Sequence, residues 1–169
     1  MACQMRALDR SEWRIFKSLR LHALQTEPGV FAASYGAEAA YGEHRWRETV
    51  QGPGHQVFGL FDDQKLIGIT AAFTWREDPC GETAILAMSF LLPEYRGRGL
   101  SRLLYDARLD WIRAQPQFKR VVVSHRDSNE ISRRANQKYG FSVFQRAARQ
   151  WPDGQVADEI FYELKIPRS

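Results

Sequence analysis

Cysteine is scarce in this chain of 169 residues, which carries only Cys3 and Cys80. Two thiols so far apart in the sequence suggest neither a disulfide framework nor a cysteine-rich metal cluster, and we expect both to be free. The four histidines also lack metal-ligand spacing. No metal cofactor is therefore expected.

Long apolar runs are missing as well. No segment approaches the roughly 20 apolar residues of a membrane-spanning helix, and the segment 1–10 has no apolar signal core. Hydrophobic residues make up 44% and charged residues 26% of the chain, which is typical of a globular protein. There is no internal repeat, low-complexity tract or linker. We expect one domain over residues 1–169, located in the cytoplasm and not bound to a membrane.

The net charge is small, +4, but it is unevenly distributed. Residues 96–134 hold ten Lys and Arg against four Asp and Glu, so the rest of the chain is slightly acidic. A local positive field favours an anionic ligand. Nucleic acid would be one such ligand, but no nucleic-acid-binding motif is present and the basic residues are spread over several predicted elements. No nucleic-acid partner is expected.

Hydrophobic periodicity and Gly/Pro breaks predict alternating elements along the chain. Seven strands are expected, at 4–8, 56–61, 65–75, 83–92, 120–124, 141–146 and 159–164. Four helices are expected, at 11–25, 37–50, 99–114 and 128–139. This order predicts an α/β chain with a mixed sheet that carries helices on both faces.

The most informative segment is 91–101, where an apolar run ends, a glycine-rich basic turn follows and an amphipathic helix begins. The first N–H groups of a helix lack internal partners and carry the positive end of the helix dipole, so they form an anion site. Gly97 and Gly99 have no Cβ and allow a phosphate to approach the backbone. Three arginines, Arg96, Arg98 and Arg102, add positive charge.

Two familiar phosphate-binding glycine loops differ from this turn in their spacing. A Walker-type loop needs a Gly-Lys-Ser/Thr ending, and a dinucleotide fingerprint needs a third glycine where this chain has Arg102. Neither pattern matches. The alternative is that the protein is an interaction domain without a ligand at this position, in which the glycine-rich segment is only an exposed turn.

The stretch Arg96-Gly97-Arg98-Gly99-Leu100-Ser101 resembles the acyl-CoA pyrophosphate loop of the GNAT superfamily of N-acyltransferases, Gln/Arg-x-x-Gly-x-Gly/Ala. Ser101 departs from the family's glycine or alanine but is also small. The resemblance implies a mostly antiparallel sheet of about seven strands flanked by about four helices. It also implies that strands 83–92 and 120–124 splay apart, with the pantetheine arm of acetyl-CoA pairing with backbone near Phe90, Leu91 and Leu92.

A second segment, 128–141, resembles the family pattern Asn-x-x-Ala/Ser-x-x-x-Tyr-x-x-x-Gly-Phe. By that resemblance Asn129 contacts the CoA arm. The family's tyrosine, which protonates the departing thiolate, is replaced by Asn136, which cannot act as an acid but can still hydrogen-bond the cofactor. Tyr139 lies nearly one helical turn further on and is a candidate substitute acid.

The resemblance implies transfer of the acetyl group of acetyl-CoA to a primary amine, by direct attack through a tetrahedral intermediate. An alkyl ammonium has a pKa of about 10.4, so the amine needs a base, and Glu82 and His125 are candidates. Five acids near the expected acceptor wall could attract a cationic amine: Glu38, Glu43, Glu77, Asp78 and Glu82. The sequence identifies neither the acceptor nor whether the protein forms a homodimer. The alternative is a non-catalytic acyl-CoA-binding module, and the absence of the family's tyrosine favours it.

Overall fold

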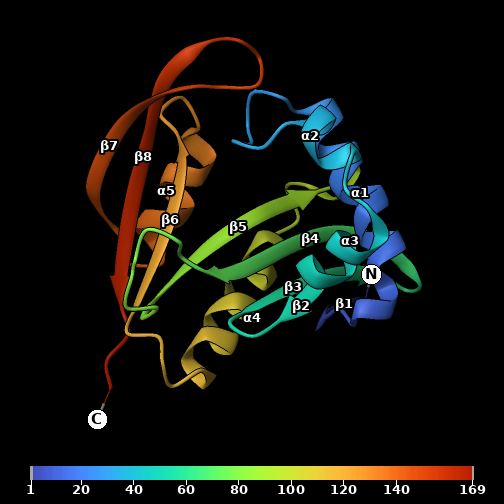
Figure 1. Ribbon diagram of the computed structural model, residues 1–169, viewed down its shortest axis with the longest axis horizontal. Coiled ribbons are helices and arrows are strands. Elements are labelled where there is room, and N and C mark those ends of the chain that lie inside the picture. The colour runs from blue at the N-terminus through green and yellow to red at the C-terminus, as the bar shows by residue number, and fades with distance from the viewer. Residues whose placement is uncertain (1, 169) are drawn as a thin grey trace.

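The computed structural model describes residues 2–168 and is built on one mixed sheet (Figure 1). Seven strands follow the order β1-β3-β4-β5-β6-β8-β7, and a short strand β2 pairs with β3 at the side. Every pairing is antiparallel except that of β5 with β6. The bounds are β1 (Cys3–Ala7), β2 (Gln51–Gly52), β3 (His55–Asp62), β4 (Lys65–Thr74), β5 (Thr83–Leu91), β6 (Arg120–Arg126), β7 (Ser142–Gln150) and β8 (Val156–Lys165). The predicted mixed, mostly antiparallel sheet is confirmed.

Helices cover both faces of this sheet. One face packs against α1 (Trp13–Thr26) and α3 (Glu43–Val50), whose Phe16 and Trp46 meet edge to face in the core. The opposite face packs against α4 (Ser101–Ala114), which buries Leu104 and Ile112. The fifth helix, α5 (Glu130–Lys138), follows β6.

The predicted single helix over 37–50 is wrong, because the chain forms two helices there. The first is α2 (Tyr35–Ala39), capped by the Ser34 side chain, which accepts from the Ala37 N–H. The second is α3, which begins after Gly42. Gly42 has extended backbone (φ −75°, ψ 170°), so the helix cannot run through it. The break lets α3 turn Trp46 and Val50 into the core independently of α2.

The parallel pair β5 and β6 is short, and this creates the gap on which the site depends. The two strands pair only over Thr83–Ile85 and Arg120–Val122, and they diverge beyond that point (Figure 1). Within β5, Met88 has a positive φ of 61°, and the register against β4 shifts near the same place. A side chain in the left-handed region marks a bulge, which bends β5 away from β6.

The strands at the carboxyl end are longer than the sequence pattern predicted. β7 and β8 form a hairpin whose turn lies at 151–154, beyond the predicted strand ends 146 and 159. Arg126 ties this hairpin to the loop after α1, because its guanidinium donates to Asp153 (2.7 Å), Gln155 (2.8 Å) and the Gly29 carbonyl (3.1 Å). None of the described helices is long and apolar enough to cross a bilayer.

Candidate active site

The glycine loop leaves the end of β5 and leads directly into α4. A short 3-10 turn (Pro93–Tyr95) follows β5, and α4 begins at Ser101. Gly97 and Gly99 have φ of +76° and +74°, a conformation that residues with a Cβ rarely adopt. A Cβ built on either glycine would meet nothing within 4 Å, so both face open space. The loop therefore presents bare backbone at the positive end of a 14-residue helix.

The rest of the loop is held by specific contacts. The Arg96 side chain donates to the Leu91 carbonyl (2.8 Å) and to the Glu27 carboxylate (2.7 Å), so it fastens the loop to the end of β5 and to the residue after α1. The Tyr95 hydroxyl donates to Asp62 (2.8 Å). The Leu92 N–H donates to the Ile67 carbonyl and is thereby used within the sheet.

A cleft of about 120 Å³ lies where β5 and β6 diverge. It is lined by residues of β5, β6, α4, α5 and the loop after α1: Val30, Phe31, Leu86, Ala87, Met88, Ser89, Tyr105, Arg108, Val123, Ser124, His125, Asn129, Ser132 and Asn136. The two asparagines selected from the sequence, Asn129 and Asn136, thus share this cleft. Asn129 caps α5, since its side chain accepts from the Ser132 N–H at 3.1 Å.

Several cleft residues were not identified as site residues from the sequence, among them two on α4. Tyr105 and Arg108 lie on α4, and the Tyr105 hydroxyl donates to Asn136 Oδ1 at 2.7 Å. The pattern did contain a signal for Arg108, because Leu104, Arg108 and Ile112 are four residues apart and all three are buried. A charged residue on the apolar stripe of a helix needs a partner or a role.

Among the candidates for proton transfer, His125 lies in the cleft. It is buried (5% exposed), its Nδ1 lies 2.6 Å from the Arg126 carbonyl, and its Nε2 lies 2.9 Å from the Tyr162 hydroxyl. The carbonyl requires a proton on Nδ1, so Nε2 accepts from Tyr162. Burial lowers the pKa of His125, which keeps the ring neutral near pH 7.

Glu82 and Tyr139 lie outside both the cleft and the larger cavity described below. Glu82 immediately precedes β5, at its paired end, and forms an ion pair with Lys119 (2.7 Å). The Tyr139 ring stacks on Tyr105 with centroids 4.5 Å apart, but its hydroxyl donates to Asp106 (2.9 Å) on the outer surface. Burial and this hydrogen bond raise the pKa of Tyr139 to about 12.

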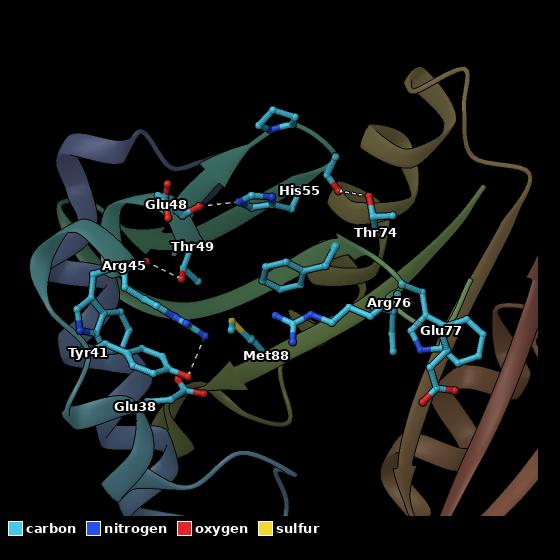
Figure 2. Close-up of a pocket in the computed structure, with 16 residues that line it drawn as sticks. Glu38, Tyr41, Arg45, Glu48, Thr49, His55, Thr74, Arg76, Glu77 and Met88 are labelled. Carbon is cyan, nitrogen blue, oxygen red and sulfur yellow. Dashed lines mark hydrogen bonds between the residues drawn. The ribbon is translucent and has the colours of Figure 1, made fainter. Parts of the chain in front are cut away.

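A larger cavity of about 780 Å³ opens beside α3 and the start of the β4–β5 turn (Figure 2). Ile85 lines it, and Met88 lines both this cavity and the cleft. The bulged residue of β5 therefore stands between two openings, one of which adjoins the splayed strands while the other faces α2 and α3. Two reactants that enter from these openings would meet at Met88.

The structure does not gather the five expected acids into an acidic wall. Glu38 lines the cavity but is buried in a two-contact ion pair with Arg20 (2.9 and 3.0 Å). Glu43 pairs with Arg47, Glu82 pairs with Lys119, and Asp78 accepts N–H groups of its own turn. Each is engaged locally, which the sequence did not reveal. Glu77 lines the cavity, yet Figure 2 shows it pointing away from the centre.

Two arginines reach into the cavity instead. Figure 2 shows Arg45 and Arg76 extending from opposite walls toward Met88. Arg45 donates to the Tyr41 hydroxyl (3.3 Å) and lies over its ring. In the described part of the chain, no carboxylate pairs with Arg45 or Arg76. The two guanidinium groups therefore lie nearest Met88, while the lining acids Glu48 and Glu77 lie farther from it (Figure 2). Residues 2–168 contain no group of three or more His, Cys, Asp or Glu side chains arranged to hold a metal.

Comparisons with known proteins agree with this geometry. Residues 16–141 match the model of the acetyltransferase (GNAT) family. A phosphinothricin N-acetyltransferase of Streptomyces coelicolor is 24% identical over 108 residues, which cover 62% of this chain and 61% of the relative. The fold resembles yncA of Salmonella typhimurium, solved with its cofactor acetyl-CoA (TM-score 0.82, 18% identity, 100% and 96% of the two chains). It also resembles a GNAT-family acetyltransferase of Streptococcus pneumoniae (TM-score 0.82, 15% identity, 98% and 100%).

The divergence of β5 from β6 and the exposed glycine loop before α4 are features of the acyl-CoA-dependent acyltransferase fold. Because the family match spans well over half of the sequence, the chain belongs to the GNAT acetyltransferase family.

Proposed function

We propose that this protein is an N-acetyltransferase that moves the acetyl group of acetyl-CoA to a primary amine. The observation that carries this proposal is the glycine loop at the start of α4, placed at the open end of a gap between β5 and β6. The acetyl-CoA bound in the Salmonella structure supports the choice of cofactor. In the Streptomyces relative the acceptor named is phosphinothricin.

The residues present suit acetyl-CoA. Gly97 and Gly99 leave room for a pyrophosphate against the first N–H groups of α4, and Arg98 and Arg102 add positive charge at its edge. Arg96 supports the loop rather than the ligand, because its guanidinium is already held by Leu91 and Glu27. Between the strands, Asn129 and Asn136 border the space for the pantetheine arm, with β5 residues such as Ser89 opposite.

Acetyl-CoA supplies an acetyl group on a thioester when it is bound. The chain contributes placement. The bulged residue Met88 lines both the cleft and the large cavity, so an amine held in the cavity would lie beside the end of the pantetheine arm. Holding two reactants in register is the main source of rate enhancement in such a reaction. For removal of the amine proton, His125 is the candidate that lines the cleft, where burial keeps its ring neutral and able to accept a proton.

The charges of the large cavity indicate what else the acceptor carries. Arg45 and Arg76 form a cationic centre, whereas Glu38 is already neutralised by Arg20. A guanidinium binds a carboxylate, phosphinate or phosphate strongly and repels an ammonium. We therefore assign an acceptor that bears an acidic group beside its amine. On this proposal a polyamine should be a poorer acceptor than an amino acid.

The test follows thiol release from acetyl-CoA with a panel of amines that includes phosphinothricin and pairs of amino acids with their carboxamides. An α-amine next to an amide has a pKa of about 8, so it is more often neutral near pH 7 than the amine of the free amino acid. The pKa of the amine alone would therefore favour the amide. A higher kcat/KM for the acid would indicate that the arginines bind its carboxylate. Arg76→Gln should abolish that preference and leave thermal stability unchanged.

Release at the uncatalysed rate with every amine would refute the catalytic assignment. If acetyl-CoA still raised the melting temperature in that case, the non-catalytic acyl-CoA-binding module would be the correct description. If it produced no shift, the glycine loop would be only a turn.

A further inference from the structure

Asn136 has a buried hydrogen-bond donor that nothing in residues 2–168 satisfies. Its side chain is 0% exposed, and its Nδ2 has no partner. The Tyr105 hydroxyl donates to Oδ1 at 2.7 Å, which fixes the orientation of the amide. A buried donor without a partner costs about 1–3 kcal/mol. Because Asn136 borders the cleft, a ligand in that cleft is the natural acceptor.

The same cleft contains a buried cation without a counter-ion. Arg108 is 2% exposed, and no Asp or Glu of the described residues pairs with it. Its Nε donates to the Leu104 carbonyl (3.0 Å), and its guanidinium lies 4.9 Å from the centre of the Tyr105 ring. Burial lowers the pKa of Arg108 to about 10, so it remains charged at pH 7. An uncompensated cation this deeply buried is costly and is best explained by a negatively charged partner.

We propose that Asn136 is the catalytic residue that donates a hydrogen bond to the CoA sulfur as the thiolate departs, with Tyr105 as its positioning residue and Arg108 as the neighbouring positive charge. The proposal rests on the proposed function. The new N–C bond forms, the C–S bond breaks, and its electron pair stays on sulfur. The proton of the amine passes to the base, for which His125 is the candidate, and Asn136 keeps its own protons.

This arrangement explains how the reaction proceeds without a proton donor at position 136. An ordinary thiol has a pKa of about 8.5, so its thiolate is an adequate leaving group if its charge is stabilised. Preorganised donors and charges aimed at a developing anion provide that stabilisation, and they do so most strongly where they are buried, as Asn136 and Arg108 are. Burial raises the pKa of Tyr105, which keeps its phenol protonated and able to hold Oδ1. Tyr139 stacks behind the Tyr105 ring and restricts its movement.

The experiment compares binding of CoA and desulfo-CoA, which lacks the thiol, by calorimetry between about pH 7 and about pH 9. If the bound thiol has a pKa one unit below its usual value, the affinity ratio of CoA to desulfo-CoA rises about sixfold over this range. Among groups that line the cleft, Tyr105 and Arg108 on α4 and His125 on β6 can titrate. With desulfo-CoA the same groups titrate, so their contribution cancels in the ratio.

Asn136→Leu and Arg108→Met should each flatten the ratio. Tyr105→Phe should reduce it in part, because the amide is still present but no longer held. Tyr35→Phe is the matched control: it also removes a phenol hydroxyl, but from a ring that is 40% exposed on α2 and lines neither the cleft nor the large cavity, and it should behave as wild type. Unchanged affinity for desulfo-CoA shows that each variant is folded.

A ratio that rises as steeply in Asn136→Leu and Arg108→Met as in wild type would overturn the proposal, as would a flat ratio in wild type. Either result would leave the proposed function intact, since desulfo-CoA would still bind. Failure of wild type to bind either compound would instead remove the proposed function itself.

Discussion

Gly99→Val should abolish binding of acetyl-CoA while leaving the protein folded. Gly99 has φ +74°, and a Cβ there meets nothing within 4 Å. The substitution therefore costs only the strain of a left-handed residue, about 1–2 kcal/mol. For a chain of this length, 1 kcal/mol changes Tm by about 2–4 °C, so Tm should fall by roughly 2–8 °C. The added side chain, however, fills the space in which a pyrophosphate would meet the backbone.

The assay is thermal unfolding with and without acetyl-CoA. At 100 times the dissociation constant a ligand adds about 2.7 kcal/mol, which corresponds to about 5–11 °C for wild type. In Gly99→Val this increase should disappear. Gly81→Val is the matched control, since Gly81 has φ +70° and is equally open, but lies in the turn before β5. The control should lose the same stability and keep the ligand-induced increase.

An equal increase in wild type and Gly99→Val would refute the assignment of the glycine loop. Loss of the increase in both valine variants would show that destabilisation, and not a blocked site, is the cause.

Other predictions concern the charges of the loop and the core. Arg98→Ala should weaken acetyl-CoA binding measured by calorimetry, and the difference from wild type should shrink at high salt because the contribution is electrostatic; a difference that salt leaves unchanged would contradict this. Glu38→Gln leaves the buried Arg20 cation without its carboxylate, and should lower the free energy of unfolding in urea by about 3–5 kcal/mol. A loss below about 1 kcal/mol would mean that solvent reaches this pair. Burial lowers the pKa of His125 in the folded protein below its unfolded value of about 6.5. As pH falls through about 6.5, the imidazole therefore becomes protonated in the unfolded chain before it does so in the folded protein. The free energy of unfolding consequently decreases below that pH. Denaturant titrations of wild type and His125→Gln should converge in stability on acidification, and parallel pH curves would contradict the reasoning.

Local sequence signals predicted the conformation of the glycine loop well. Glycines flanked by arginines before an amphipathic helix predict a turn with positive φ and an anion site, since both properties depend on neighbouring residues alone. The structure places Gly97, Gly99 and Ser101 at the start of α4 as expected. Seven of the eight strands were found as well, with ends wrong by a few residues, whereas the two-residue strand β2 was not predicted.

Partners distant in sequence could not be predicted. Tyr105 and Asn136 are 31 residues apart, and Glu38 is 18 residues from Arg20. Hydrophobic patterning does not predict which acidic and basic side chains form ion pairs. Glu38 and Glu82, which we expected to face a substrate, pair with Arg20 and Lys119 instead. The bulge at Met88 gave no signal either, because a positive φ at a methionine is imposed by the surrounding sheet.

What the sequence determined by itself was the order of most elements and the conformation of one loop, because periodicity and glycine placement act over a few residues. Only the tertiary structure decided that β5 leaves β6 after three paired residues, that two cavities meet at one bulge, and that a lone amide and a lone guanidinium share the cleft. These features arise from packing between segments far apart in the chain, where burial gives an unpaired donor or charge its energetic cost.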